Sequence, residues 1–351
     1  MYKLSGKIGH HFFDGLIAGR CGYRRDELAQ GPQFGLDVAV VDLHNNLSMA
    51  LTSDPLSLIP SLGMQESAWL SVHLMANDMA TTGFAPMYAQ FVLNLPPSLS
   101  QQDFDSYWSY IHQYCVSMKT SITGGHTGFI EGQNSTIAGG GTFITVAPKN
   151  QLLTANMAQT DDEILVTKSC AISSAAILAL SFPQTVKNKA GTEIQNLAGE
   201  SFYHTSSLKD ALAAVGDARE YTDVSAMHDV TEGGVLGAIY EMATASNLGA
   251  LVFDQKLPIN QVQEKVCAVF DLNPRFCIGA GAMIIACKKG TSATVVERLA
   301  KENIACTKVG EFKPKAFGVK LCKQEQKVDM PYLSTDPYWA AFFNALNSGW
   351  K

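Results

Sequence analysis

Alternating and clustered apolar residues near the start of the chain predict β-structure. Residues 37–43 and residues 47–52 are both rich in Val, Ala, Leu and Met. Between them, Asn45 and Asn46 are residue types that tolerate a tight turn. Two apolar runs joined by such a turn predict a β-hairpin.

Two later segments have the spacing of amphipathic helices, with apolar residues at i, i+3 and i+4. One is 65–82, in which the apolar face consists of Ala68, Val72, Met75, Ala76 and Met79. The other follows Ser100 and Asp103, which resemble a capping box. Its apolar stripe consists of Phe104, Tyr107, Trp108, Ile111, Tyr114, Cys115 and Met118. Bulky apolar groups at this spacing indicate packing against a core.

Shorter patterns complete the expected organisation. Strands are expected at 87–95, 121–123, 136–146, 163–167, 282–287 and 319–322, and helices at 173–180, 206–215, 235–243 and 293–302. The polar segment 148–162 predicts a domain boundary, and the polar segment 187–200 predicts a mobile loop. Strands and helices do not alternate strictly, which favours an α+β fold over a doubly wound parallel sheet.

Composition narrows the class of protein. The chain has 351 residues, 46% of them hydrophobic, which is enough for two domains with ample core. The longest apolar runs are too short to span a membrane, and residues 1–7 lack the apolar stretch of a signal peptide. A net charge of −6 without a basic cluster argues against nucleic acid as a partner. The eight cysteines lack C-x-x-C spacing, so we expect reduced, mostly buried thiols and a cytoplasmic protein.

Acidic and amide side chains stand at strand ends and on a helix in the first half. Asp37 opens the first strand, Asp54 closes the second, and Asn77 and Asp78 interrupt an apolar helix. Carboxylates on neighbouring elements can bind Mg²⁺, which prefers oxygen ligands and shares them with phosphates. Each residue alone also fits a plainer interpretation, as a turn former or as a solvent-facing helix residue.

Two glycine-containing segments carry further candidates. His126 lies in the segment 123–128, just past a strand, and such a segment is also typical of a turn. A polar loop at 226–236 runs into a helix, whose N-terminal N–H groups favour anions. His228 in that loop is either a general base near a phosphate or a hydrogen-bonded structural group. The sequence contains no P-loop, nucleophile elbow or dinucleotide fingerprint.

Taken in order, these segments resemble the AIR synthase (PurM-like) superfamily, closest to its HypE-like AIR synthase-related group. The resemblance runs from Gly6 and Lys7 to about Leu321. The motifs that carry it are GPQFGLDVAV at 31–40, TSDP at 52–55, ANDMA with GFAP at 76–86, GGHT at 124–127, MHDVTEGGV at 227–235 and GAGA at 279–282.

The resemblance implies two α+β domains, at 1–158 and 159–325, and a C-terminal tail at 326–351. In this family the N-terminal domains pair across a homodimer into a β-barrel, and the C-terminal domain is an α/β sandwich. The resemblance also implies an ATP-dependent enzyme that uses Mg²⁺. Such an enzyme phosphorylates or activates an amide, carboxylate or related oxygen on a small-molecule or protein-borne acceptor.

The matching motifs imply a set of site residues. The metal ligands are Asp37, Asp54 and Asp78, and the catalytic residues are Asp54, Asp78, His126 and His228. The nucleotide-binding residues are Lys7, Gly35, Asn77, Gly124, Gly125, Thr127, Asp229, Thr231, Glu232, Gly233 and Gly234.

The chain departs from the family pattern at four places. HypE ends in a cysteine that carries the substrate, whereas the last cysteine here is Cys322, so the HypE reaction on its own tail is not expected. His126 stands where HypE has an Asp, and Leu36 stands where many relatives have an acid. The segment KSCAISS at 168–174 replaces one that usually contains glycines. These departures predict a thinner metal site.

Because of these departures, two other functions stay open. One is a nucleotide-binding assembly or regulatory protein without turnover, and the other is a small-molecule kinase resembling thiamine-monophosphate kinase. Two assignments also stay open. Cys170 is either an acceptor near the cleft or a small buried residue, and the segment 187–200 is either a lid over ATP or a disordered loop.

Overall fold

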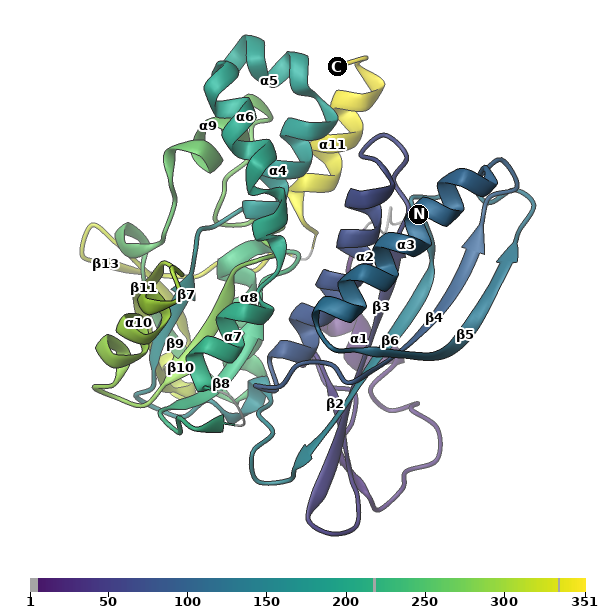
Figure 1. Cartoon of the computed structure of the whole chain (residues 1–351). Coiled ribbons are helices and arrows are strands. Elements are labelled where there is room, and N and C mark those ends of the chain that lie inside the picture. The colour runs from purple at the N-terminus through teal and green to yellow at the C-terminus, as the bar shows by residue number, and fades with distance from the viewer. Residues whose placement is uncertain (1–5, 217–218, 334) are drawn as a thin grey trace.

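A computed structural model describes residues 6–216, 219–333 and 335–351. The N-terminal half of the chain forms one sheet, and the C-terminal half forms a second sheet with helices on both faces (Figure 1). No helix in these described residues is long and apolar enough to cross a membrane. The first five residues, part of the segment in which no signal peptide is expected, lie outside the described residues.

The N-terminal sheet has one face covered by two helices. Its elements are α1 (His10–Leu16), β1 (Leu28–Gln30), β2 (Ala39–Asp42), β3 (Leu47–Ser57), α2 (Met64–Ala80), β4 (Tyr88–Leu95), α3 (Gln101–Ser117), β5 (Ser121–Phe129) and β6 (Ile137–Pro148), with the strand order β1-β2-β3-β6-β4-β5. The stripe predicted for α3 packs into this core through Tyr107, Ile111 and Cys115. Ser100 caps α3 as predicted, because its Oγ accepts a hydrogen bond from Asp103 N at 3.0 Å.

The predicted hairpin is confirmed, and two strands are longer than predicted, since β3 continues past residue 52 to Ser57. β2 and β3 pair antiparallel, and Asn45 and Asn46 between them have φ angles of 60° and 57°. β5 runs on past the predicted 121–123, because its glycines form an edge strand parallel to β4. At Gly125 (φ +144°) a Cβ would lie 1.8 Å from Phe91 O, so the pairing of these strands requires glycine there.

The C-terminal sheet is covered on both faces. Its strands are β7 (Glu163–Thr167), β8 (Val224–Asp229), β9 (Leu248–Phe253), β10 (Met283–Cys287), β11 (Cys306–Pro314), β12 (Val319–Lys323) and β13 (Gln326–Asp329), in the order β13-β12-β9-β11-β7-β10-β8. Ile164 and Val166 of β7 pack on the side of α8 (Gly234–Ala245). Leu165 packs on the other side, with α7 (Leu208–Val215) and α10 (Ser292–Lys301). Most strand pairs are antiparallel, so the α+β class is confirmed.

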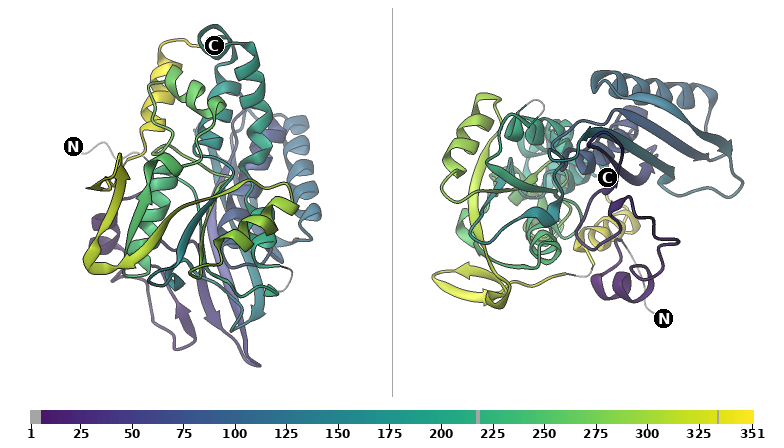
Figure 2. Two further views of the ribbon diagram at one scale, coloured as in Figure 1. Left: turned by 90° about the vertical axis from the view of Figure 1, so that its left-hand side faces the viewer. Right: turned by 90° about the horizontal axis from the view of Figure 1, so that it is seen from below.

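A group of helices forms one end of the C-terminal half (Figures 1 and 2). It contains α4 (Ile172–Ser181), α5 (Pro183–Ala190), α6 (Thr192–Glu200), α9 (Gln261–Val269) and α11 (Pro337–Asn347). The short 3₁₀ turns are η1 (Ala155–Met157), η2 (Ser201–Thr205), η4 (Asp254–Lys256) and η5 (Lys315–Phe317).

The prediction of a mobile loop at 187–200 is wrong. This segment belongs to α5 and α6, and its buried residues Ile194 and Ala198 pack in one cluster with Val186. Most residues of the segment are polar because these short helices bury only a narrow apolar stripe. The polar composition of this segment therefore concealed the spacing of its few apolar residues, which is that of a helix.

Other elements were not predicted. The segment 226–229, expected in a polar loop, is the end of β8, and His228 and Asp229 in it are buried. Polar residues inside a buried strand conceal its pattern. The elements α1, β1, β9, α9, β11, β13 and α11 were also missed, and the last two lie in the expected C-terminal tail. All eight cysteines are free thiols and six are buried, as expected.

Helix α2 is fastened to the C-terminal half through its side chains. Asn77 Nδ2 donates to Thr205 O at 2.9 Å, and Ser207 N donates to Asn77 Oδ1 at 2.7 Å. The Trp69 indole Nε1 donates to Thr205 Oγ1 at 2.9 Å and its ring stacks on His73 at 3.6 Å. Asn77 is fully buried and both ends of its amide are used, so it joins the two halves.

We predict that His73 makes the protein less stable in acid. Burial lowers the pKa of His73 to about 3, so the unfolded state binds its proton first as pH falls below about 6.5. The free energy of unfolding should therefore fall with pH between about 6.5 and 3, by up to about 1.4 kcal/mol per pH unit from this residue. Urea unfolding at several pH values should show a shallower slope for His73→Phe, which keeps the stack on Trp69.

Ser206→Ala is the matched control. It removes the 3.0 Å hydrogen bond to His73 Nδ1 but leaves the imidazole buried. Its stability should drop at every pH with the slope unchanged. An unaltered slope in His73→Phe would contradict the assignment.

Candidate functional site

A cavity of about 920 Å³ lies between the two halves of the chain. Its walls come from the N-terminal segment, β3, α2, α4, α11 and the loop between β8 and α8. Among the predicted site residues, those that line it are Lys7, Asp37, Asp54, Asp78, Asp229, Thr231 and Glu232. The structure thus gathers residues that are up to 225 positions apart in the sequence.

Five carboxylates line this cavity, and besides Glu232 they are four aspartates from different elements. Asp37 precedes β2, Asp54 lies in β3, Asp78 lies near the end of α2, and Asp229 ends β8. Thr52 Oγ1 donates to Asp78 Oδ2 at 2.8 Å and so orients that carboxylate. Asp37 Oδ2 and Asp229 Oδ1 are buried without a hydrogen-bond partner among the described residues. Such atoms are costly to bury unless a ligand pairs with them.

The carboxylates in this cluster all favour protonation. Burial raises the pKa of Asp54 to about 6 and that of Asp229 to about 8. For Asp78, burial and then the neighbouring carboxylates raise the pKa well above its ordinary value. Burial also raises the pKa of Asp37, although the charge of His228 opposes this. A bound cation would stabilise the charged forms of these carboxylates, which burial and mutual repulsion disfavour.

A buried imidazole lies behind the carboxylates. His228 Nδ1 lies 3.5 Å from Asp37 Oδ2 and donates to Asp229 O at 2.7 Å. Its Nε2 lies 3.5 Å from Glu241 Oε2, which also accepts from Lys7 Nζ at 2.9 Å. Burial lowers the pKa of His228, but the Asp37 and Glu241 carboxylates outweigh it and raise the pKa to about 9. A protonated, enclosed imidazole favours the structural alternative for His228 over the general base.

Glu241 balances the two positive groups. Burial raises its pKa, but the charges of Lys7 and His228 outweigh it and lower the pKa to about 2. The Glu241 carboxylate in turn raises the pKa of Lys7, against the effect of burial. Gly35, expected at the nucleotide, has φ +78°, and a Cβ there would lie 2.5 Å from Glu241 O. Glycine is therefore required where the segment leading to Asp37 crosses α8.

One carboxylate connects the N-terminal segment to the C-terminal helix. Glu232 Oε2 accepts from Lys7 N at 2.5 Å, and Glu232 Oε1 accepts from Trp339 Nε1 at 2.9 Å. At Gly6 (φ +78°), a Cβ would lie 2.5 Å from the same carboxylate. Glu232 thus links the N-terminal segment and the C-terminal helix where all three line the cavity.

The loop before α8 already holds an anionic group of the protein. Gly233 N donates to Asp336 Oδ2 at 2.7 Å. Gly234 has φ +63°, and a Cβ there would lie 2.7 Å from Arg275 O, so glycine is needed for close packing. If this loop binds a phosphate as expected, Thr231 is the better candidate, because it lines the cavity, whereas Gly233 N is already hydrogen-bonded to Asp336.

Several predicted site residues lie away from the cavity in the single chain. Asn77 is the buried clamp described above. Gly124, Gly125, His126 and Thr127 lie on the exposed edge strand β5. Their roles in nucleotide binding and catalysis stay predictions.

The segment 168–174, which lacks the family's glycines, makes structural contacts within the C-terminal half. Lys168 Nζ donates to Ser206 O at 2.6 Å and to Gly281 O at 2.9 Å, and it pairs with Asp210 at 2.9 Å. Cys170 is fully buried, and burial raises its thiol pKa to about 12. This favours the interpretation of Cys170 as a small buried residue.

The aromatic side chains of α11 are the part of the site that was not predicted. Tyr338, Trp339, Phe342 and Phe343 all line the cavity. The local signal was present, since Asp336 caps the helix at Tyr338 N and an aromatic stripe follows. This segment follows the last family motif, so the resemblance says nothing of it.

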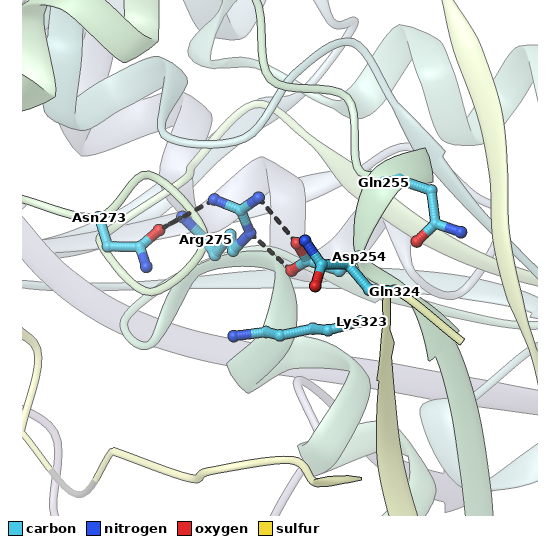
Figure 3. Close-up of a pocket in the computed structure, with 6 residues that line it drawn as sticks. All are labelled: Asp254, Gln255, Asn273, Arg275, Lys323 and Gln324. Atoms are coloured by element: carbon cyan, nitrogen blue, oxygen red, sulfur yellow. Dashed lines mark hydrogen bonds and ion pairs between the residues drawn. The ribbon is translucent and has the colours of Figure 1, made fainter. Parts of the chain in front are cut away.

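A second, more open pocket lies at the surface (Figure 3). It is lined by Asp254, Gln255, Asn273, Arg275, Lys323 and Gln324. The Arg275 guanidinium makes a bidentate pair with Asp254, at 2.8 and 3.0 Å. Because this pair neutralises the guanidinium, the arrangement favours a structural role over anion binding.

The two halves define a two-domain α+β fold with a carboxylate cluster between the domains. The model of the AIR synthase related protein N-terminal domain matches residues 35–146, and that of the C-terminal domain matches residues 159–321. The chain belongs to the AIR synthase related family. This confirms the family indicated by the sequence motifs.

Two proteins of other organisms are similar to this chain in sequence. A hydrogenase expression/formation protein of Methanocaldococcus jannaschii is 24% identical over 235 residues, which cover 66% of this chain and 64% of that protein. The carbamoyl dehydratase HypE of Bradyrhizobium diazoefficiens is 24% identical over 227 residues, covering 61% of this chain and 59% of HypE. The match thus spans less than two thirds of the length of either relative.

Solved structures share the fold. The hydrogenase maturation protein HypE in complex with ATP has a TM-score of 0.66 at 18% identity, covering 86% of this chain and 89% of that chain. Thiamine monophosphate kinase from Aquifex aeolicus has a TM-score of 0.65 at 16% identity, covering 84% and 92%. Both support the two-domain PurM-like fold.

We predict that Glu241→Ala destabilises the protein strongly. It would leave Lys7 and His228 without their shared carboxylate, and breaking a buried ion pair costs roughly 3–5 kcal/mol. The free energy of unfolding, measured with urea at pH 7, should fall by that amount. Glu264→Ala, on the exposed side of α9, is the control and should change it little. Equal stability of the two variants would show that the network does not hold the cleft together.

Proposed function

We propose that this protein is an enzyme that uses Mg²⁺-ATP to phosphorylate or activate an oxygen of a small amide, carboxylate or related acceptor. The observation that carries the proposal is the convergence of four carboxylates from both halves on one cleft. Membership of the AIR synthase related family supports it. The relative named carbamoyl dehydratase and the HypE structure with ATP support ATP use on an amide-type acceptor.

The residues present fit a hard cation. Two buried carboxylate oxygens, Asp37 Oδ2 and Asp229 Oδ1, have no hydrogen-bond partner among the described residues. One ligand atom each from Asp37, His228 and Asp229 lie within 4.8 Å of one another. Since His228 Nδ1 is engaged, the ligands would be carboxylates: Asp37 and Asp229, with Asp54 and Asp78 beside them. When bound, Mg²⁺ neutralises phosphate charge and supports its transfer.

The chain's own residues position the reactants. The Lys7 side chain is 44% exposed, and its ammonium, held by Glu241, would place a positive charge beside the phosphates. The buried His228 keeps Asp37 in place, and Thr52 does the same for Asp78. Walls from both halves would exclude water and align the acceptor oxygen with the terminal phosphorus. Such chemistry needs alignment and charge stabilisation more than a protein nucleophile.

A second candidate is a small-molecule kinase. It is supported by the fold shared with thiamine monophosphate kinase. Calorimetric titration of ATP with and without Mg²⁺, with phosphate release followed in the same samples, tests the proposal. Mg²⁺-dependent binding with release stimulated by amides or carboxylates supports it. Transfer to a hydroxyl or phosphate acceptor favours the kinase, and binding without release under any acceptor favours a protein without turnover.

We predict that Asp54→Asn separates binding from stability. Losing the carboxylate should weaken Mg²⁺-ATP affinity by at least about tenfold, because a hard cation loses a ligand charge. Burial raises the pKa of Asp54, so the fold favours its neutral form and the neutral variant should be no less stable at pH 7. Calorimetry and urea unfolding measure the two effects.

Asp42→Asn is the control. Asp42 lies on β2, is paired with Lys149, and is not among the residues described as lining the cavity. Its Mg²⁺-ATP affinity should equal that of the wild type. Unchanged affinity in Asp54→Asn would overturn the assignment of this carboxylate.

We propose that the protein is a homodimer in which N-terminal sheets pair into a barrel. The face of β4 turned away from α2 and α3 exposes Tyr88 and Val92, and β5 exposes Phe129. An uncovered apolar sheet face with an edge strand favours association. Such pairing would bring the segment 124–127 beside the second copy.

Sedimentation at micromolar concentration tests the dimer. We expect the wild type to sediment as a dimer and Val92→Glu to sediment as a monomer, because a charge would be buried in the pairing face. Val116→Glu, on the exposed face of α3, should leave the dimer intact. A monomeric wild type would refute the pairing.

A further inference from the structure

The C-terminal helix adds an apolar wall to a cleft that is acidic elsewhere. Helix α11 lies beyond the family-matched residues 159–321. Its side chains Trp339, Phe342 and Phe343 line the same cavity as the carboxylates. The family models therefore do not account for this wall.

The cavity changes character along the axis of α2. Leu70, Leu74 and Asp78 all line it and are four residues apart, so they lie on one face of the helix. At 1.5 Å per residue, Leu70 lies about 12 Å along the helix from Asp78. Leu70 also belongs to an apolar cluster with Ile177 of α4 and Ile59, both of which line the cavity. One end of the cavity is thus acidic and the other is hydrocarbon.

Helix α11 is held rigidly in this place. Asp336 caps it and accepts from Gly233 N, and Trp339 donates to Glu232. The Phe342 ring packs on Phe182, in the core of the helical group, with ring centres 5.3 Å apart. Phe343, by contrast, is 50% exposed. A pre-positioned, half-exposed aromatic ring provides contact area at little cost in conformational entropy.

The chemistry of the apolar end selects among ligands. Two hydroxyls of α4 that line it are already used as donors, because Ser173 Oγ and Ser174 Oγ both donate to Ile278 O, at 3.1 and 2.7 Å. A nucleotide base has polar edges that need hydrogen-bond partners when buried. A hydrocarbon or unsubstituted aromatic ring has no such need.

We infer that Phe342 and Phe343 of α11 and the apolar face of α2 form an acceptor subsite for a flat apolar group, on the α2 side at Leu70, about 12 Å along the helix from Asp78. The acceptor class is a carboxamide or carboxylate attached to an aromatic or similar apolar body, with its oxygen directed toward the acidic end. This inference rests on the proposed function and names its substrate class. Phe343 is a specificity-determining residue in it.

Benzamide and acetamide are the probes, since they share a carboxamide and differ in the ring. Calorimetry or saturation-transfer NMR on the full chain with Mg²⁺ and ATP should detect binding of benzamide and much weaker or no binding of acetamide. Phe343→Ala should weaken benzamide binding at least about fivefold, with Mg²⁺-ATP affinity unchanged. Leu346→Ala, which is 54% exposed on the same helix, should alter neither affinity.

Phe343→Leu distinguishes contact from fold, because it keeps the volume apolar but removes the ring. It should bind benzamide with intermediate affinity and melt with the wild type. Two outcomes overturn the inference: benzamide binding no better than acetamide, or weaker Mg²⁺-ATP binding in Phe343→Ala with benzamide unaffected, which would assign the wall to the base. The proposed function fails separately, if the wild type binds no Mg²⁺-ATP.

Discussion

The burial of several carboxylates at one place is the constraint on which the rest of the structure depends. Burial raises the pKa of Asp37, Asp54, Asp78 and Asp229, so their charged forms are costly to hold together. The protein offsets this with the protonated His228, which is held through Asp37 and Glu241. Since the carboxylates come from both halves, neither half can form the cleft alone.

Helix α2 is the physical link between the cluster and the fold. One of its faces presents Asp78 to the cleft, while Asn77, one residue earlier, binds the backbone of the other half. The adjacent stack of Trp69 and His73 extends the same contact. A helix that is fixed on both sides keeps its carboxylate in place without help from a ligand, which is the kind of rigidity that a phosphate-handling site needs.

Local periodicity was enough to predict much of the fold. The hairpin at 37–52 and the helices α2 and α3 follow from residue spacing, because each buries a face wide enough to be seen in a short window. The segment 187–200 failed this test, since α5 and α6 bury only narrow stripes. β8 failed because its buried residues include His228 and Asp229.

The candidate site was predictable in its charged residues and not in their partners. Asp37, Asp54 and Asp78 could be found because they stand in motifs that match the family in order, although each alone also fits a plainer interpretation. Glu241 could not, because it looks like an ordinary helix residue until folding brings it to the site. Long-range contacts of this kind leave no trace in local spacing.

The pairing of Lys7 with Glu241 has a consequence for biosynthesis. These residues are 234 positions apart, so the N-terminal segment is made long before its partner. At typical rates of translation, the interval is on the order of 10–50 s. During that time the segment lies free and open to proteases or chaperones, and the cleft closes only when the second half of the chain has left the ribosome.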